Sequence, residues 1–120
     1  MIEDMYQENI LDHYQHPRHF GHLEGAQHTG REVNALCGDQ LSFEIKEEGG
    51  KATAMFTGKG CAISQASASM LAELAYGKTL PELRAITQED VLGALGIAIS
   101  PARLKCALLS WATLRKALAL

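Results

Sequence analysis

The sequence lacks several features that would place it in whole classes of protein. No apolar run approaches the roughly 18 consecutive residues that a membrane-spanning helix needs. Lysine and arginine number 11 against 14 acidic residues, and a net charge of -3 provides no basic field for nucleic acid. The acidic start, Met1–Asp4, has no signal-peptide pattern. We therefore expect a soluble cytoplasmic protein that binds neither nucleic acid nor membranes.

Signals for a disulfide framework or for a linker are missing as well. The three cysteines, Cys37, Cys61 and Cys106, are odd in number, widely separated and without C-x-x-C spacing. A reducing cytosol would keep them as thiols, so their possible roles are metal binding, catalysis or simple burial in the core. No repeat or linker divides the 120 residues, so we expect one domain over residues 1–120.

The N-terminal half predicts one helix followed by three strands. The helix is expected over residues 3–15, and it should end before Pro17 because proline disfavours helical geometry in the residue ahead of it. Weak alternation over 29–34, strong alternation over 40–46 and a return over 51–57 predict a small antiparallel sheet.

The C-terminal half is rich in helix formers. Four helices are expected, over 62–76 with Gly77 as terminator, from Thr79, from Thr87 to about Leu95, and from Ser100 to the C-terminus. The last of them places four large residues near one face, namely Leu104, Leu108, Trp111 and Leu118. Strands followed by helices in one short chain indicate an α+β fold, with a three-stranded sheet packed against several helices.

Cys37 and Cys61 both lie beside glycine at predicted turns. In Cys37–Asp39 the glycine lets the backbone approach a bound ion, and the aspartate adds a hard oxygen ligand. In Gly58–Ser64 two glycines leave the Cys61 sulfur uncrowded, and the following helix N-terminus would favour its thiolate. Small residues at tight corners are also ordinary packing, so both interpretations stay open.

Cys106 is expected about one turn into the last helix. Arg103 and Lys105 flank it, and their charges together with the helix terminus are expected to lower the pKa of its thiol. The alternative is a buried cysteine on an amphipathic helix, with two solvated basic neighbours.

Three thiols and one carboxylate make a complete ligand set for zinc or an iron–sulfur centre. The set is Cys37, Asp39, Cys61 and Cys106. Without C-x-x-C spacing these residues can meet only through the fold. The five histidines instead occupy one N-terminal block interrupted by Pro17, where we expect solvated side chains rather than a metal site.

Four segments of the chain form a recognisable set. They are Tyr6 with Ile10–Tyr14 and Pro17–Arg18, then Asn34–Asp39, then Gly60–Ala62 with Ala66–Ser69, and last Arg103–Cys106 with Leu109 and Trp111. In this order they resemble the IscU/SufU/NifU N-terminal family of iron–sulfur cluster assembly proteins, over nearly the whole chain.

The resemblance implies a small sheet packed against helices, with the three cysteines at one exposed end, and a scaffold rather than an enzyme. Such a scaffold would accept sulfur from a cysteine desulfurase, hold iron in a nascent [2Fe-2S] cluster, or a zinc ion, and pass the cluster to apoproteins. Carried onto this chain, Cys37, Cys61 and Cys106 become ligands and sulfur acceptors. Asp39 becomes a loose oxygen ligand that keeps the cluster exchangeable.

Several positions depart from the pattern of the family. Ala35 replaces a proline, and Ile99–Arg103 replaces the Leu-Pro-Pro-Val-Lys chaperone motif, which argues against an Hsp70-type partner. Lys105 replaces the histidine of IscU types, as in SufU types, yet the short span from Cys61 to Cys106 lacks the SufU insertion. A protonated lysine is a poor ligand, so we expect Lys105 to tune Cys106 or to contact a partner.

Two functions follow from the resemblance. One is a scaffold that assembles and donates an iron–sulfur cluster. The other is a zinc-bound partner that accepts persulfide sulfur and stimulates a desulfurase, which Lys105 favours. A thiol hydrolase that pairs cysteine with histidine is a third hypothesis, but the sequence has no local signature for it. A globular domain whose three cysteines are simply core residues is a fourth, and it would require the three motifs to have arisen by chance.

Overall fold

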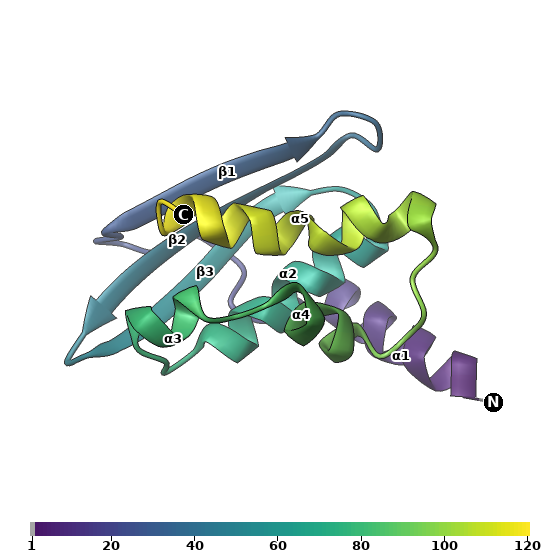
Figure 1. Ribbon diagram of the computed structural model, residues 1–120, viewed down its shortest axis with the longest axis horizontal. Coiled ribbons are helices and arrows are strands. Elements are labelled where there is room, and N and C mark those ends of the chain that lie inside the picture. Colours follow the sequence, from purple (N-terminus) through teal and green to yellow (C-terminus); the bar gives the residue numbers. More distant parts are fainter. Residues whose placement is uncertain (1) are drawn as a thin grey trace.

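The chain folds into a three-stranded sheet with five helices, as Figure 1 shows for the computed structural model. The structure describes the backbone of residues 2–120 and the side chains of residues 8–120, so the Tyr6 side chain lies outside the described part. In chain order the elements are α1 (Ile2–Gln15), β1 (His28–Asn34), β2 (Asp39–Glu48), β3 (Lys51–Lys59), α2 (Ala62–Ala75), α3 (Leu80–Arg84), α4 (Gln88–Leu95) and α5 (Pro101–Ala117). The predicted α+β class is confirmed.

The sheet has the order β1-β2-β3, and both neighbouring pairs are antiparallel. The alternation in β2 buries Leu41, Phe43 and Ile45 on the face that meets the helices, as predicted. The outer edge of β3 is covered by the loop after α1, because the Phe56 N–H donates to the His19 carbonyl at 3.0 Å. The loop therefore blocks pairing of another chain at this point of the strand edge.

Helices α2 and α5 lie on the same side of the sheet, with α3, α4 and α1 beyond them (Figure 1). The two helices approach closely through small residues, and the Ser67 hydroxyl lies 2.7 Å from both the Ala107 carbonyl and the Ser110 hydroxyl. At the other end of α5, a Cβ on Gly30 would come within 2.7 Å of the Ala117 Cα. A larger residue at that point would push α5 away from β1.

The four large residues predicted near one face of α5 do not together form its buried face. The helix buries small and medium residues instead, namely Cys106, Ala107, Leu109, Ser110, Thr113, Leu114 and Ala117. Leu104 is 38% exposed, Leu108 and Trp111 are half-buried, and only Leu118 of the predicted set lies in the core. Close contact with α2 and β1 requires small side chains, so the large ones are turned aside.

The predicted helix boundaries are largely confirmed. Thr79 and Thr87 each form a capping box, in which the hydroxyl accepts from a backbone N–H three residues on. Gly77 follows α2 with φ +78°, the left-handed conformation that glycine adopts without strain. Within residues 2–120 no helix has both the length and the hydrophobicity for crossing a membrane.

Candidate metal centre

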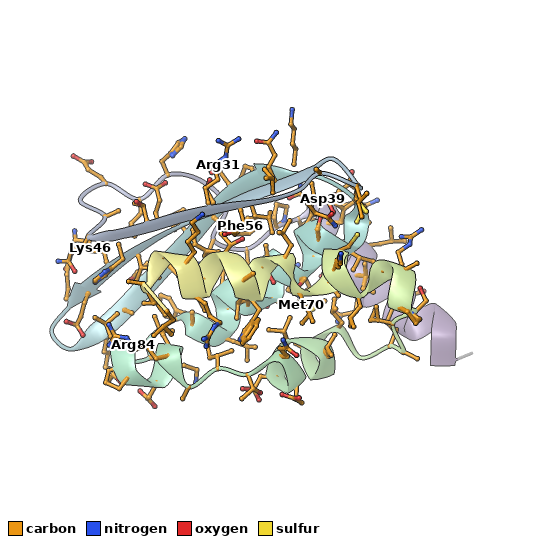
Figure 2. All side chains as sticks on the ribbon, turned by 45° about the horizontal axis from the view of Figure 1, so that its top comes forward. Arg31, Asp39, Lys46, Phe56, Met70 and Arg84 are labelled. Atoms are coloured by element: carbon orange, nitrogen blue, oxygen red, sulfur yellow. The ribbon has the colours of Figure 1, made fainter. Side chains whose placement is uncertain are left out.

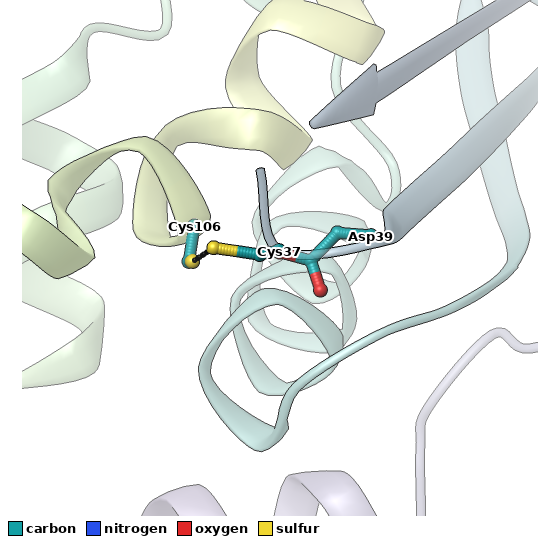
Figure 3. A group of neighbouring side chains, drawn as sticks. All are labelled: Cys37, Asp39 and Cys106. Carbon is teal, nitrogen blue, oxygen red and sulfur yellow. Dashed lines mark hydrogen bonds between the residues drawn. The ribbon is translucent and has the colours of Figure 1, made fainter. Parts of the chain in front are cut away.

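The predicted site residues lie where three parts of the fold meet (Figures 2 and 3). Cys37 is in the turn between β1 and β2, and Asp39 begins β2. Cys61 is the N-cap of α2, and Cys106 lies in the second turn of α5. The antiparallel turn and the two helices therefore bring residues that are distant in sequence to one end of the sheet.

Two thiols and one carboxylate converge at this end. One ligand atom from each of Cys37, Asp39 and Cys106 lies within 4.8 Å of the others, and the two Sγ atoms are 3.2 Å apart. Asp39 is 1% exposed and Cys106 is 2% exposed, whereas Cys37 is exposed. Sulfur and carboxylate donors at this spacing could hold zinc or iron, and Cys37 leaves one side open for exchange.

Cys61 adjoins this group through Asp39 rather than joining it directly. Its backbone N–H donates to Asp39 Oδ1 at 2.9 Å, and its Sγ lies 4.0 Å from Asp39 Oδ2. The Ser64 hydroxyl lies 3.8 Å from the same sulfur. The structure thus brings three of the four predicted residues together, with the fourth at the edge of the group.

Glycines permit this arrangement at two points. Gly38 has φ +71°, which turns the chain between the cysteine and the aspartate. A Cβ on Gly60 would collide with Asp39 Oδ1 and come within 2.8 Å of the Ser64 hydroxyl. The glycine before Cys61 therefore makes room for the aspartate, in addition to forming the predicted turn.

Two polar residues near the thiols had not been identified from the sequence as part of the site. The Asn34 side-chain amide lies 3.9 Å from Cys106 Sγ, and the Asn34 carbonyl accepts from the Cys37 N–H at 3.2 Å. Ser64 contacts Cys61 from one turn into α2. Asn34 occurs in the first motif and Ser64 has helical spacing from Cys61, but only the fold shows what each touches.

The expected lowering of the pKa of Cys106 is wrong for the metal-free chain. Burial raises the pKa of this thiol, and the neighbouring Cys37, Asp39 and Cys61 raise it further. Arg103 and Lys105 are both exposed to solvent, and the field of the helix terminus weakens beyond its first turn. A metal ion would have to displace the proton of this thiol on binding.

A hollow of about 500 Å³ opens beside the thiols, between the β1 end and α5. Its lining is mainly apolar and includes Leu36, Leu104, Leu108 and Trp111. Leu36, next to Cys37, is 84% exposed. Three of the four large residues predicted near one face of α5, Leu104, Leu108 and Trp111, form one wall of this hollow.

The histidines do not gather at one site. His13 is buried, with Nδ1 2.7 Å from the Ser69 hydroxyl and Nε2 3.4 Å from the Glu73 carboxylate. Burial lowers the pKa of His13, and the Arg18 charge acts in the same direction. His22 is exposed beside Glu44. The expectation of solvated histidines is thus correct for His22 and wrong for His13, which joins α1 to α2.

Residues 5–120 match the family described as the NifU-like N-terminal domain. The chain belongs to this family. It is 36% identical to the iron-sulfur cluster assembly scaffold protein IscU 1 of Archaeoglobus fulgidus, covering 95% of this chain and 74% of that protein. It is 32% identical to the zinc-dependent sulfurtransferase SufU of Bacillus subtilis, covering 98% and 92%. The resemblance seen in the sequence is confirmed.

The family fold is confirmed by solved structures. A Fervidobacterium islandicum crystal structure, assigned as a cluster assembly scaffold of the SUF system, aligns with a TM-score of 0.80. Its sequence identity is 29%, and the alignment covers 97% of this chain and 98% of that one. A NifU-like N-terminal protein from Brucella abortus aligns with a TM-score of 0.75 at 25% identity, covering 98% and 94%.

Proposed function

We propose that this protein accepts sulfur from a cysteine desulfurase in the cytoplasm, builds a [2Fe-2S] cluster on its thiols and passes it to apoproteins. Cys37, Cys61, Cys106 and Asp39 are the proposed ligands. The observation that carries the proposal is the convergence of Cys37, Asp39 and Cys106 within 4.8 Å. Exposed Cys37 gives iron, sulfide and acceptor proteins access, while the buried pair shields the opposite side.

Anaerobic reconstitution with ferrous iron and sulfide tests the scaffold role. The wild-type chain should develop the visible absorption of a protein-bound cluster, and Cys37→Ser should lose it. Ala35→Ser, in the same exposed loop, is the matched control and should retain the chromophore. A colourless wild-type product, or an undiminished chromophore in Cys37→Ser, would contradict the proposal.

The second candidate is a zinc-bound sulfur acceptor that stimulates a desulfurase. It is supported by Lys105, which leaves three thiols and Asp39 as the ligands, and by the similarity to a zinc-dependent sulfurtransferase. Metal analysis of freshly purified protein separates the two. One tightly held zinc per chain, with faster desulfurase turnover, favours transfer; a zinc-free chain that reconstitutes a cluster favours the scaffold.

A further inference from the structure

We propose that Cys37 and Cys106 act as a dithiol pair, in which Cys106 reduces a persulfide carried on Cys37 and releases its outer sulfur as sulfide. This inference rests on the proposed function, because it names the cysteine that receives sulfur and the source of the electrons that release it. The two side chains point toward each other in Figure 3, with their Sγ atoms 3.2 Å apart.

The two thiols differ in access, and the difference assigns their roles. Cys37 is exposed in the turn after β1, so a sulfur donor can reach it. Cys106 is 2% exposed and lies against the Cys37 sulfur, with the Asn34 amide 3.9 Å away. An outside persulfide therefore meets Cys37 first, and Cys106 is placed to attack what forms there.

Cys61 is placed for a different contact. Its Sγ lies near Asp39 Oδ2 and the Ser64 hydroxyl, at 4.0 Å and 3.8 Å. Among the described thiols the pair in direct sulfur–sulfur contact is Cys37 with Cys106. The structure therefore selects one of the three cysteine pairings.

The chemistry balances without a further reductant in the releasing step. A donor persulfide first transfers its outer sulfur to the Cys37 thiol and leaves as a thiol. The Cys106 sulfur then attacks Cys37 Sγ, forming a disulfide and breaking the bond to the outer sulfur. That sulfur leaves as hydrosulfide and takes the proton of Cys106, giving hydrogen sulfide.

The electrons for this step come from the cysteines themselves. The outer sulfur gains two electrons, and the two thiols lose two in becoming a disulfide. The gap of 3.2 Å need only close to the about 2.05 Å of a disulfide bond. An external dithiol then restores both thiols, becoming a disulfide in turn. The step belongs to the metal-free chain, because a bound metal would occupy both sulfurs.

The test uses metal-free protein and glutathione persulfide, with rapid desalting before sulfide release and intact mass are followed. Wild type should release about one sulfide per chain and end two hydrogens lighter than the reduced chain. Cys106→Ala should retain one extra sulfur atom on Cys37 and release at least about tenfold less sulfide. Cys61→Ala, matched in having two thiols, should still form the disulfide.

Peptide mapping of the wild-type chain after mild peroxide oxidation provides a second measurement that needs no variant. Two thiols and one hydrogen peroxide give a disulfide and two waters, and the disulfide should join Cys37 to Cys106. A link to Cys61, or a stable persulfide on wild-type Cys37, would overturn the proposal. These assays contain no iron and no desulfurase, so their failure is distinct from failure of cluster assembly.

Discussion

The Asp39 carboxylate is bonded to the backbone of Cys61, with Oδ1 accepting from its N–H at 2.9 Å. Because Cys61 is the N-cap of α2, this bond satisfies a backbone donor at the helix start. The other oxygen, Oδ2, lies 4.0 Å from Cys61 Sγ and faces the thiols. One buried side chain thus supports the fold with one oxygen and supplies a candidate ligand with the other.

Substitution of Asp39 should separate these two roles. Asp39→Asn keeps an oxygen that can accept the bond, so its free energy of unfolding should stay within about 1 kcal/mol of wild type. Asp39→Ala leaves the Cys61 N–H without its partner and should cost about 1–3 kcal/mol. Both variants should bind zinc more weakly because the anionic ligand is gone. Urea unfolding of the metal-free chains and zinc competition titrations measure the two effects; equal destabilisation by both substitutions would contradict the argument.

Gly60→Ala should disturb the site by adding an atom that collides with Asp39, rather than by removing a hydrogen bond. The added Cβ collides with Asp39 Oδ1 and crowds the Ser64 hydroxyl, so we expect a loss of about 1–3 kcal/mol in unfolding free energy and weaker metal binding. Gly93→Ala is the matched control, because nothing lies within 4 Å of its added Cβ and the residue is within α4. That change should stabilise the helix by up to about 1 kcal/mol. Similar urea midpoints for both variants would refute the steric argument.

Stability should depend on pH through His13. Its folded-state pKa is lowered, chiefly by burial, so the unfolded chain takes up the proton first as the pH falls. The contribution of neutral His13 is therefore complete above the unfolded pKa of about 6.5 and declines below it, levelling off once the folded state also protonates. His13→Asn, which can still reach Ser69, should flatten this decline in urea midpoints measured from about pH 7.5 to about pH 5. The exposed His22→Asn controls for loss of a histidine, and an unchanged slope in His13→Asn would count against the assignment.

The serine contacts between α2 and α5 should matter for the thiols as well as for stability. Ser67→Ala leaves the Ala107 carbonyl and the Ser110 hydroxyl without their shared partner, at a cost of about 1–3 kcal/mol. Ser110→Ala keeps the bond from Ser67 to Ala107, so its cost should be smaller. Because Ala107 follows Cys106, loosening this contact should also make the Cys106 thiol react faster with a maleimide. Faster labelling in Ser110→Ala than in Ser67→Ala would show that another contact holds α5.

The sequence predicted what depends on neighbours along the chain. Alternation in β2, the helix starts at Thr79 and Thr87 and the glycine after α2 are local signals, and they were right. The buried face of α5 was not predicted, because its small and medium residues become core only when α2 and β1 lie against them. The raised pKa of Cys106 could not be predicted for the same reason, since its burial and its contacts with Cys37 and Asp39 arise only in the tertiary structure.

The candidate site itself could be proposed only as a set of residue types. Motif order indicated which cysteines to group, but nothing in their spacing shows a contact between Cys37 and Cys106. Asn34 and Ser64 could be placed beside sulfur only from the fold, and so could the bond from Cys61 to Asp39. Such relationships come from packing between segments that are far apart in the chain.

The contact between Cys37 and Cys106 joins residues 69 positions apart, and that between Asp39 and Cys61 spans 22. The first contact needs the β1–β2 turn and the docked α5, and the second needs the start of β2 and the start of α2. Any ion held by all of these residues would therefore add its binding free energy to the stability of the completed structure, and unfolding of α5 alone would remove the Cys106 ligand. The affinity of these residues for an ion should thus depend on whether the last helix is in place.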